Sequence, residues 1–511
     1  MENLVVKVLK NRYIDSVSLM ALSTRVNQLA DVSQAIVAMG TDMNKEVMRN
    51  AGLSNEQVEG AAASDLIITL KTHVSDEQLI LQQVEDLLSE KKIATTNAER
   101  VYHTVQEARQ NEEANLALIS VNGHYATREA LQALHHNLNV MMFSDNVSIE
   151  DEKMLKELAI EKGLLMMGPD CGTAIINSVG LGFANTIRRG NIGIVGASGT
   201  GSQELSVRIH EFGGGVSQLL GTGGRDLSTE IGGQMMLAAI DMLAKDDQTD
   251  VLALVSKPPA KEVQDKIIAK VKTIGKPVVI WFVGEMDQRH EETIYFEDMS
   301  KNAALRAIEL AGYDISKIDT HPLNWPLITE VRQKLKPEQQ WIRGLFTGGT
   351  LAAEAFYVAK ESFSNVYSNS VKNPENQLPQ DSEQGHFFID FGADEYTDGK
   401  PHPMIDPSNR IAQFRKEANN PEVAVILLDF VLGYGAHEDP VGVMADEIIR
   451  AKEQASKEGR HLEVIGYVLG TDQDTQGLTA QLAKLEATGA TYASSMQNAA
   501  LLAREFVGKD E

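Results

Sequence analysis

Short apolar runs rich in β-branched residues alternate with longer amphipathic stretches along almost the whole chain. Buried parallel strands have short apolar runs of this kind, and the crossover helices between such strands are amphipathic. The pattern therefore predicts an α/β protein in which most strands are parallel. We expect strands at Ala35–Met39, Asp65–Leu70, Leu116–Val121, Val140–Phe143, Leu164–Met167, Ile192–Val195, Val251–Val255, Val278–Phe282, Gly344–Thr347, Phe387–Asp390, Val423–Leu428 and Val464–Val468.

Two stretches interrupt the alternation. Residues 361–385 are rich in Ser, Asn, Gln and Pro, so we expect an exposed polar insertion that buries little. Three prolines lie between residues 318 and 340 and predict a domain boundary there. We accordingly divide the chain into domains at residues 1–186, 187–330 and 341–511.

The second and third domains show the same order of motifs. The second contains NIGIVGASGTGSQELSVRI, GTGGRDLSTE, DVLALVSKPP and KPVVIWFVGE, and the third contains RGLFTGGTLAAEAFYVA, DFGADEYTDG, EVAVILLDFVLGYG and LEVIGYVLGT. In both, a strand leads into a turn of small residues and a helix, followed by a second turn and two buried strands. Two equivalent α/β units are therefore expected to face each other.

Charge and cysteine content narrow the partners and the compartment. The 511 residues include 47 Lys and Arg against 72 Asp and Glu, and the net charge of −25 disfavours nucleic acid and anionic membranes as partners. The single cysteine, Cys171, excludes internal disulfides and cysteine-based zinc sites, fits a reducing cytosol, and is expected to be buried rather than nucleophilic. The N-terminal apolar run is too short for a signal sequence or membrane helix, so we expect a cytoplasmic protein.

Two glycine-rich turns are candidates for phosphate binding. The turn GASGTG joins a buried strand to a helix, so free backbone N–H groups and the helix dipole favour an anion there. The third domain repeats the arrangement with the turn TGGT. A tight strand-to-helix turn also needs glycine for steric reasons alone, so a structural role stays open. If the repeats pack about a pseudo-twofold axis, both turns point at one anion. The predicted phosphate-binding residues are Ser198, Gly199, Thr200, Thr347, Gly348, Gly349 and Thr350.

Two cations are candidate catalytic residues. Arg225, in the turn GTGGRD, has the planar fork that binds a carboxylate or phosphate through two hydrogen bonds, and an ion pair with Asp226 or Glu230 is the alternative. Lys257 ends a buried strand in front of two prolines and is suited to stabilise an oxyanion or a departing phosphate. A solvated surface lysine is the alternative for Lys257.

The histidines predict no metal site. His437 stands beside two acidic residues, but adjacent side chains rarely point the same way, so a structural role is the better interpretation. Neither the pair His135–His136 nor His402 has a third ligand at a suitable spacing.

The motifs, taken in order, resemble known families. GNIGIVGASGTGSQE, GTGGRD and GKPVVIWFVGE look like the ligase domain of the succinyl-CoA synthetase α subunit, and LALISV, NLNVMMFSDNVSIEDEKML and KGLLMMGPDCG look like the second half of its CoA-binding domain. MMFSDNVSIEDE, GLLMMGPDCGT, GASGTGSQEL, GGRDLS, VSKPPA, TGGTLAAEA and GKPHPMIDP resemble the FdrA family over nearly the whole chain. This resemblance implies an N-terminal Rossmann-like domain of the CoA-binding type, then two flavodoxin-like synthetase domains, of the α-ligase and β C-terminal types, without an ATP-grasp domain.

Three departures from the synthetase bear on the chemistry that the resemblance implies. The segment that carries the synthetase phosphohistidine is replaced by GEMDQRHEETIYF, so His290 is not expected to carry a phosphoryl group. The glycine-rich turn for the CoA diphosphate is missing, with MGTDMNKE as its nearest approach, so CoA is possible and no cofactor is firmly predicted. Where the synthetase has a glutamate that supports its phosphohistidine, this chain has the stretch around Lys257. A base in place of an acid suits a site that holds a phosphate ester.

The FdrA resemblance implies a subunit of a multi-subunit oxamate carbamoyltransferase of allantoin and purine catabolism. Such an enzyme moves a carbamoyl group between oxamate and phosphate, giving oxalurate and carbamoyl phosphate in its two directions. The two turns would hold the phosphate, Lys257 would polarise the carbonyl and Arg225 would hold the oxamate carboxylate. The implied partners are the other transferase subunits, and an oligomer is expected. Two alternatives stay open: an acyl-CoA synthetase that borrows an ATP-grasp subunit, and a non-catalytic scaffold.

Overall fold

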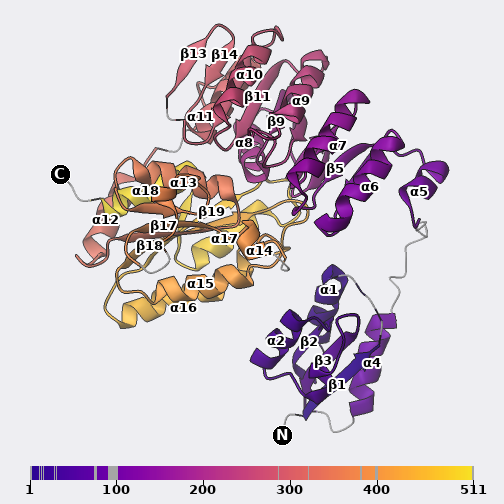
Figure 1. Cartoon of the computed structure of the whole chain (residues 1–511). Coiled ribbons are helices and arrows are strands. Elements are labelled where there is room, and N and C mark those ends of the chain that lie inside the picture. The colour runs from indigo at the N-terminus through magenta and orange to yellow at the C-terminus, as the bar shows by residue number, and fades with distance from the viewer. Residues whose placement is uncertain are drawn as a thin grey trace. The chain divides into compact units, whose positions relative to one another are not determined.

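The computed structural model describes residues 3–10, 12, 14, 16–27, 29, 31–73, 77–89, 102–285, 287–319, 322–379, 383–397 and 401–508. The chain divides into two compact units, Met1–Val101 and Tyr102–Glu511 (Figure 1). Each expected strand overlaps an observed strand, and the α/β class is confirmed.

The first unit is built on a small antiparallel sheet. Strands β1 (Asn3–Leu9), β2 (Val32–Met39) and β3 (Leu66–Thr72) pair in the order β1-β3-β2. Helices α1 (Ser16–Asn27) and α4 (Glu77–Ser89) contribute side chains to one core with this sheet. The short helices α2 (Asp42–Asn50) and α3 (Glu56–Glu59) contribute to a second core.

This antiparallel unit corrects the expectation of one Rossmann-like domain over residues 1–186. The boundary between the compact units falls after Val101, inside that range, and all pairs in the first sheet are antiparallel. An apolar run shows that a strand is buried but does not show the direction of its neighbour, so the sequence pattern did not distinguish the two arrangements.

The second unit begins with a three-stranded parallel sheet in the order β4-β5-β6. Helices α5 (Val105–Asn111), α6 (Gly123–His135) and α7 (Ile149–Glu161) accompany this sheet, and its core is small. The strands are β4 (Leu116–Ile119), β5 (Asn139–Met142) and β6 (Met166–Met167).

Two larger sheets follow. The first has the order β13-β14-β12-β11-β9-β10-β7-β8 and the second has the order β16-β17-β15-β18-β19-β20. The strands of the first are β7 (Thr173–Ile176), β8 (Val179–Gly182), β9 (Arg189–Gly196), β10 (Val216–Gly221), β11 (Val251–Ser256), β12 (Val278–Phe282), β13 (Arg289–Glu291) and β14 (Ile294–Phe296). Those of the second are β15 (Trp341–Phe346), β16 (Val366–Ser368), β17 (His386–Asp390), β18 (Val423–Val431), β19 (Glu463–Leu469) and β20 (Thr491–Ala493).

The internal repeat is confirmed by these sheet orders. The run β14-β12-β11-β9-β10 corresponds strand by strand to β20-β19-β18-β15-β17, and every pair within both runs is parallel. All nine residues of β18 are buried, as in a central strand covered on both faces.

Helices cover both faces of each large sheet. In the first repeat α8 (Gly199–Glu211) and α11 (Ser300–Leu310) share one core, whereas α9 (Gln234–Lys245) and α10 (Lys261–Val271) share another. Val207 of α8 belongs to the core of the second repeat and Ala353 to that of the first, so α8 and α13 meet between the repeats. In the second repeat the helices are α13 (Gly349–Lys360) and α18 (Met496–Val507) in one core, with α15 (Ser408–Ala418), α16 (Gly442–Lys457) and α17 (Leu478–Ala487) in the other (Figure 1).

The prediction of an exposed polar insertion over residues 361–385 is partly wrong. Within residues 361–385, β16 pairs with β17, and Val366 and Ser368 are fully buried. A few apolar side chains suffice here because the strand extends an existing sheet edge. The proline-rich stretch 318–340 carries helix α12 (Trp325–Lys334), which packs on the core of the second repeat.

No helix among the described residues is long and apolar enough to cross a bilayer.

Candidate anion-binding site

The first turn of α8 presents free backbone donors. The Ser198 side chain caps the helix and accepts the N–H of Gly201 at 3.2 Å, which leaves the N–H groups of Gly199 and Thr200 without an intrahelical acceptor. A Cβ atom at residue 201 would lie 2.9 Å from Val255 Cγ2, so only glycine allows this close approach. The turn follows β9 directly, and its donors therefore lie at the carboxyl end of the sheet.

The first turn of α13 lies against the first turn of α8. Gly348 has no side chain to cap α13, and a Cβ atom there would overlap Thr200 Cγ2. The hydroxyls of Ser198 and Thr350 form a short hydrogen bond across the two repeats. The predicted convergence of the two helix N-termini is therefore confirmed.

Lys257 extends from the end of β11 to the N-terminus of α13. Its Nζ would lie 2.8 Å from a Cβ atom placed on Gly349, and the same Cβ would overlap Oδ2 of Asp390, which ends β17. Lys257 is half-buried, and Asp390 is 6% exposed. We call the first turns of α8 and α13, with Lys257 and Asp390, the anion cradle.

Thr347 does not join the cradle as expected. Its backbone N–H donates to Asp429 at 2.9 Å, and its hydroxyl donates to Asp429 Oδ2 at 2.9 Å. Asp429 is in turn held by Arg410 at 2.8 Å. The prediction that Thr347 binds phosphate is corrected, because both of its donors fix the turn instead.

His402 is a residue of this site that the sequence analysis did not identify. Its Nδ1 accepts the N–H of Met404 at 3.2 Å, and its Nε2 would lie 2.8 Å from a Cβ atom on Gly392. Burial lowers the pKa of His402 to about 4, so the ring is neutral near pH 7 and its proton resides on Nε2. The sequence showed no third ligand that would make His402 part of a metal site. Its place as a hydrogen-bond donor beside Gly392 comes from contacts that form only in the folded chain.

Asp170 adds a titratable carboxyl beside the second glycine-rich turn. Its Oδ2 would lie 3.0 Å from a Cβ atom on Gly224, and the residue itself is exposed to solvent. Desolvation by the surrounding chain raises the pKa of Asp170 to about 7, and the negative charge of Asp394 contributes while Lys257 opposes. A carboxyl with this pKa can exchange a proton near neutral pH.

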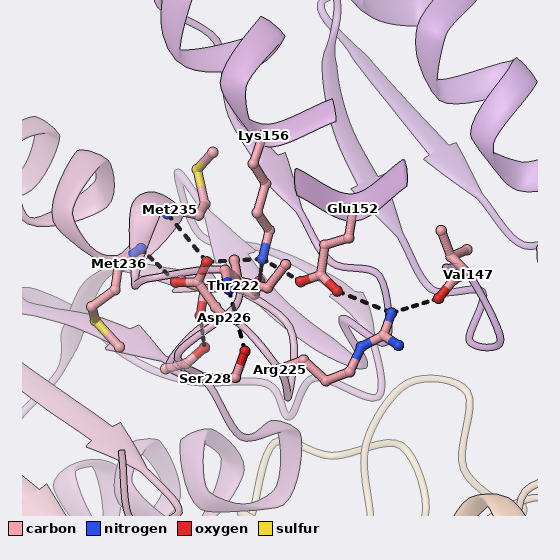
Figure 2. Close-up of polar contacts among 11 residues, drawn as sticks. Val147, Glu152, Lys156, Thr222, Arg225, Asp226, Ser228, Met235 and Met236 are labelled. Carbon is pink, nitrogen blue, oxygen red and sulfur yellow. Dashed lines mark hydrogen bonds and ion pairs between the residues drawn. The ribbon is translucent and has the colours of Figure 1, made fainter. Parts of the chain in front are cut away.

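A buried ionic network joins α7 to the turn after β10, as Figure 2 shows. Lys156 is fully buried, and its Nζ donates to Glu152 Oε1 at 2.7 Å, Asp226 Oδ1 at 2.8 Å and the Thr222 carbonyl at 2.9 Å. Asp226 also accepts the first N–H groups of α9, from Met236 at 2.8 Å for example. The network therefore fixes the turn GTGGRD against α7.

Arg225 belongs to the edge of this network. Its Nη2 lies 2.9 Å from Glu152 Oε2 and donates to the Val147 carbonyl at 2.7 Å (Figure 2). The ion pair expected as the alternative is present, but with Glu152 rather than with Asp226 or Glu230. The contact with a substrate carboxylate stays a prediction.

A second buried cluster lies between α8 and α13. Glu204 and Glu354 occupy equivalent positions of the two helices, and Ser300 donates to Glu354 at 2.9 Å. Tyr467 donates to Glu204 at 2.5 Å, and Arg208 lies 3.7 Å from the same carboxylate. Burial raises the pKa of Glu354 to about 8, so this carboxyl is protonated at neutral pH.

Cys171, His437 and His290, which the sequence analysis also considered, make contacts of a structural kind. Burial raises the pKa of Cys171 to about 12, which agrees with an unreactive thiol. His437 accepts the N–H of Asp439 at 3.0 Å and donates its own backbone N–H to Met404. His290 lies on the exposed edge strand β13 and stacks on Tyr295 with 4.5 Å between ring centroids.

Three family models match the chain. A CoA-ligase domain matches residues 345–506, a CoA-binding domain matches residues 187–284, and the heavy metal-associated domain of AllF matches residues 1–104. YahF of Escherichia coli K12 is 54% identical over 506 residues, which is 98% of each chain. The chain belongs to the YahF family. This member of the family thus combines matches to CoA-binding and CoA-ligase domains with a match to a domain of the AllF type.

More distant relatives match only part of this architecture. The α subunit of the ADP-forming succinate–CoA ligase of Aquifex aeolicus is 27% identical over 190 residues, which cover 36% of this chain and 61% of that subunit. Acetyl-coenzyme A synthetase 1 of Ca. Korarchaeum cryptofilum, solved with phosphate and ADP, is 14% identical with a TM-score of 0.31, over 85% of this chain and 93% of that one. A TM-score this low says nothing about the site.

The first unit contains no thiolate ligand for a heavy metal. Soft metals select thiolate ligands, and the one cysteine of the chain is residue 171, outside the matched range. Among the described residues, no three His, Cys, Asp or Glu side chains are arranged to hold an ion.

The segment that comes nearest to a glycine-rich CoA turn in the sequence has a structural role. The segment MGTDMNKE follows β2 of the antiparallel sheet, and a Cβ atom on Gly40 would overlap the Ala62 carbonyl. This glycine serves backbone packing, and the CoA-binding model matches residues 187–284 instead.

Proposed function

We propose that this chain is an FdrA-type subunit of an oxamate carbamoyltransferase, and that the anion cradle binds the phosphate of carbamoyl phosphate. The observation that carries the proposal is the meeting of the two helix N-termini, where Ser198 bonds Thr350 and Lys257 lies beside Gly349. Free N–H groups, two helix dipoles and a lysine favour a dianion. Carbamoyl transfer to or from phosphate requires neither ATP nor a phosphohistidine.

The cradle residues have defined roles in this reaction. The amide nitrogen of oxamate attacks the carbamoyl carbon, a C–N bond forms, and the C–O bond to phosphate breaks with its electron pair leaving on phosphate. Lys257 and the helix N-termini stabilise the departing phosphate. His402 Nε2–H donates to the oxyanion on the carbamoyl oxygen. Asp170, with its pKa of about 7, accepts the proton that the amide nitrogen loses.

A second candidate function is acyl-CoA synthesis with a separate ATP-grasp subunit. It is favoured by the CoA-binding and CoA-ligase models that match residues 187–284 and 345–506. The same cradle would then hold an acyl phosphate. In either function the other subunits and an oligomeric assembly are part of the proposal.

The test is a phosphate-dependent cleavage of oxalurate by the full chain together with the subunits that copurify with it. We expect carbamoyl phosphate and oxamate as products, without ATP or CoA. Gly349→Ala fills the space between Lys257 and Asp390 and should lower the rate by about a hundredfold or more, as loss of a preorganised anion site does.

Gly172→Ala is the control for this test, because its Cβ would meet only Phe183 at 3.7 Å. Formation of an acyl-CoA that depends on ATP and CoA, with no cleavage of oxalurate, would establish the second function instead.

A further inference from the structure

We propose that Asp390 selects acyl phosphates whose acyl group carries an N–H donor and rejects those that carry a methyl group at the same place. This inference rests on the proposed function, because it concerns the group attached to the phosphate in the anion cradle. It assigns to the chain a specificity-determining residue outside the helix turns.

The Asp390 carboxylate is held firmly by its neighbours. Its Oδ1 accepts the N–H of Gly392 at 2.8 Å. The Asn369 side chain bonds both backbone groups of Asp390, accepting from its N–H at 2.8 Å and donating to its carbonyl at 2.9 Å. The second oxygen, Oδ2, points at Gly349, and no donor among the described residues reaches it. Oδ2 is therefore an acceptor fixed toward the cradle.

Asp390 Oδ2 is a fixed acceptor that still reaches solvent, although the residue as a whole is only 6% exposed. Asp390 does not cap α13, since none of the N–H groups described for the first turn of that helix donates to it. Lys257 stands near the same glycine but not within ion-pair distance of this carboxylate in the described structure. A ligand in the cradle covers this oxygen, and a covered carboxylate oxygen without a donor costs free energy, so a ligand that supplies a donor is favoured.

The position of Oδ2 defines which ligand atom meets it. The phosphate takes the helix N–H groups, and Lys257 and Asp390 flank Gly349 on the way out of the cradle. A planar group next to the phosphate can then place its carbonyl oxygen toward Lys257 and His402 and its NH2 toward Asp390. An acetyl group would place a methyl against Oδ2 and leave it unsatisfied.

Asp390→Asn reverses this recognition without changing the shape of the side chain. Gly392 N–H must still find an oxygen, so the amide oxygen replaces Oδ1 and the NH2 group replaces Oδ2. The cradle then presents a donor where the wild-type chain presents an acceptor. Asp394→Asn is the matched control, because it removes the same charge from an exposed side chain four residues away.

The experiment measures affinities of carbamoyl phosphate, acetyl phosphate and inorganic phosphate for the full chain by calorimetry. We expect the wild-type and Asp394→Asn chains to prefer carbamoyl phosphate over acetyl phosphate by at least about tenfold, since a site built for an N–H donor rejects analogues without one. Asp390→Asn should bring this ratio near one while inorganic phosphate still binds.

Equal wild-type affinities for the two acyl phosphates, or a preference that survives in Asp390→Asn, would overturn the inference and leave the phosphate site intact. Failure of the wild-type chain to bind any of the three ligands would overturn the proposed function, and this inference with it. The wild-type ratio alone decides the question if Asp390→Asn does not fold.

Discussion

At the scale of single residues, the cradle depends on which polar side chains are already occupied. Thr347 is committed to Asp429 and Arg225 to Glu152. Lys257 forms no ion pair with any described residue, so its charge is available to a ligand. Lys257 follows β11, and its half-buried ammonium group lies near the first turn of α13. A charge in such a place acts on an anion more strongly than a charge in bulk water.

Lys257→Met tests this charge directly. Methionine keeps much of the apolar stem, so no large cavity opens. We expect carbamoyl transfer by the assembled enzyme to fall by about a hundred- to a thousandfold, the usual effect of losing one preorganised electrostatic group. The melting temperature should stay unchanged. Unchanged turnover would show that Lys257 is a solvated surface residue.

His290→Ala tests the absence of a phosphohistidine mechanism. The side chain lies on an exposed edge strand and stacks on Tyr295, without the small neighbours that would let a phosphorylated ring move. We expect the activity of the assembly to stay within a few-fold of wild type in a steady-state assay. A thousandfold loss would restore the synthetase mechanism.

At the scale of elements, the turn GTGGRD is positioned by α7 through the buried network around Lys156. The cation has three oxygen acceptors, and two of them belong to the buried carboxylates Glu152 and Asp226. Removing one partner of such a network leaves uncompensated charge in the interior. The network therefore stabilises the contact between the β4-β5-β6 subdomain and the first repeat.

Lys156→Met should lower the free energy of unfolding of the second unit by about 3–5 kcal/mol, because two buried carboxylates lose their shared cation. The measurement is urea unfolding followed by tryptophan fluorescence, since all three tryptophans lie in that unit. Lys153→Met, an exposed lysine on the same helix, should change the stability by less than about 0.5 kcal/mol. Equal effects of the two substitutions would contradict this account.

The sequence predicted the repeat and the glycine turns because strand order and turn chemistry are local signals. Lys257 was predicted at the carboxyl edge of a strand, and the structure places it beside Gly349. His402 and Asp390 were not predicted as site residues, since their part in the cradle comes from contacts between distant segments. The antiparallel first unit was missed for the same reason, because strand direction depends on pairing.

At the scale of the whole molecule, the two repeats meet along α8 and α13 over a pair of equivalent glutamates. The folded chain holds the proton of Glu354 until about pH 8, because its pKa is raised, whereas an unfolded chain releases it near the ordinary glutamate pKa of 4.5. The unfolded state therefore binds fewer protons between these values, and stability falls as the pH rises from 4.5 to 8. Glu204, Arg208 and Tyr467 face the same cluster.

The glutamine of Glu354→Gln is neutral at every pH, so this variant should not lose stability as the pH rises from 4.5 to 8. We expect the variant to gain stability relative to wild type between pH 5 and about pH 8.5, measured as the difference in melting temperature at the two values. Glu338→Gln, an exposed glutamate, should show no such change with pH. A pH-independent difference between Glu354→Gln and wild type would contradict the buried protonated state.

The hydrogen bond between the Ser198 and Thr350 hydroxyls means that the proposed anion cradle is assembled from two homologous halves of a single polypeptide. Separate subunits would form such a site only above the concentration at which they associate. Covalent linkage replaces that requirement with a high effective concentration that does not change on dilution. It also fixes the ratio of the halves at one to one, so a change in the expression level of the gene cannot leave one half of the site without the other.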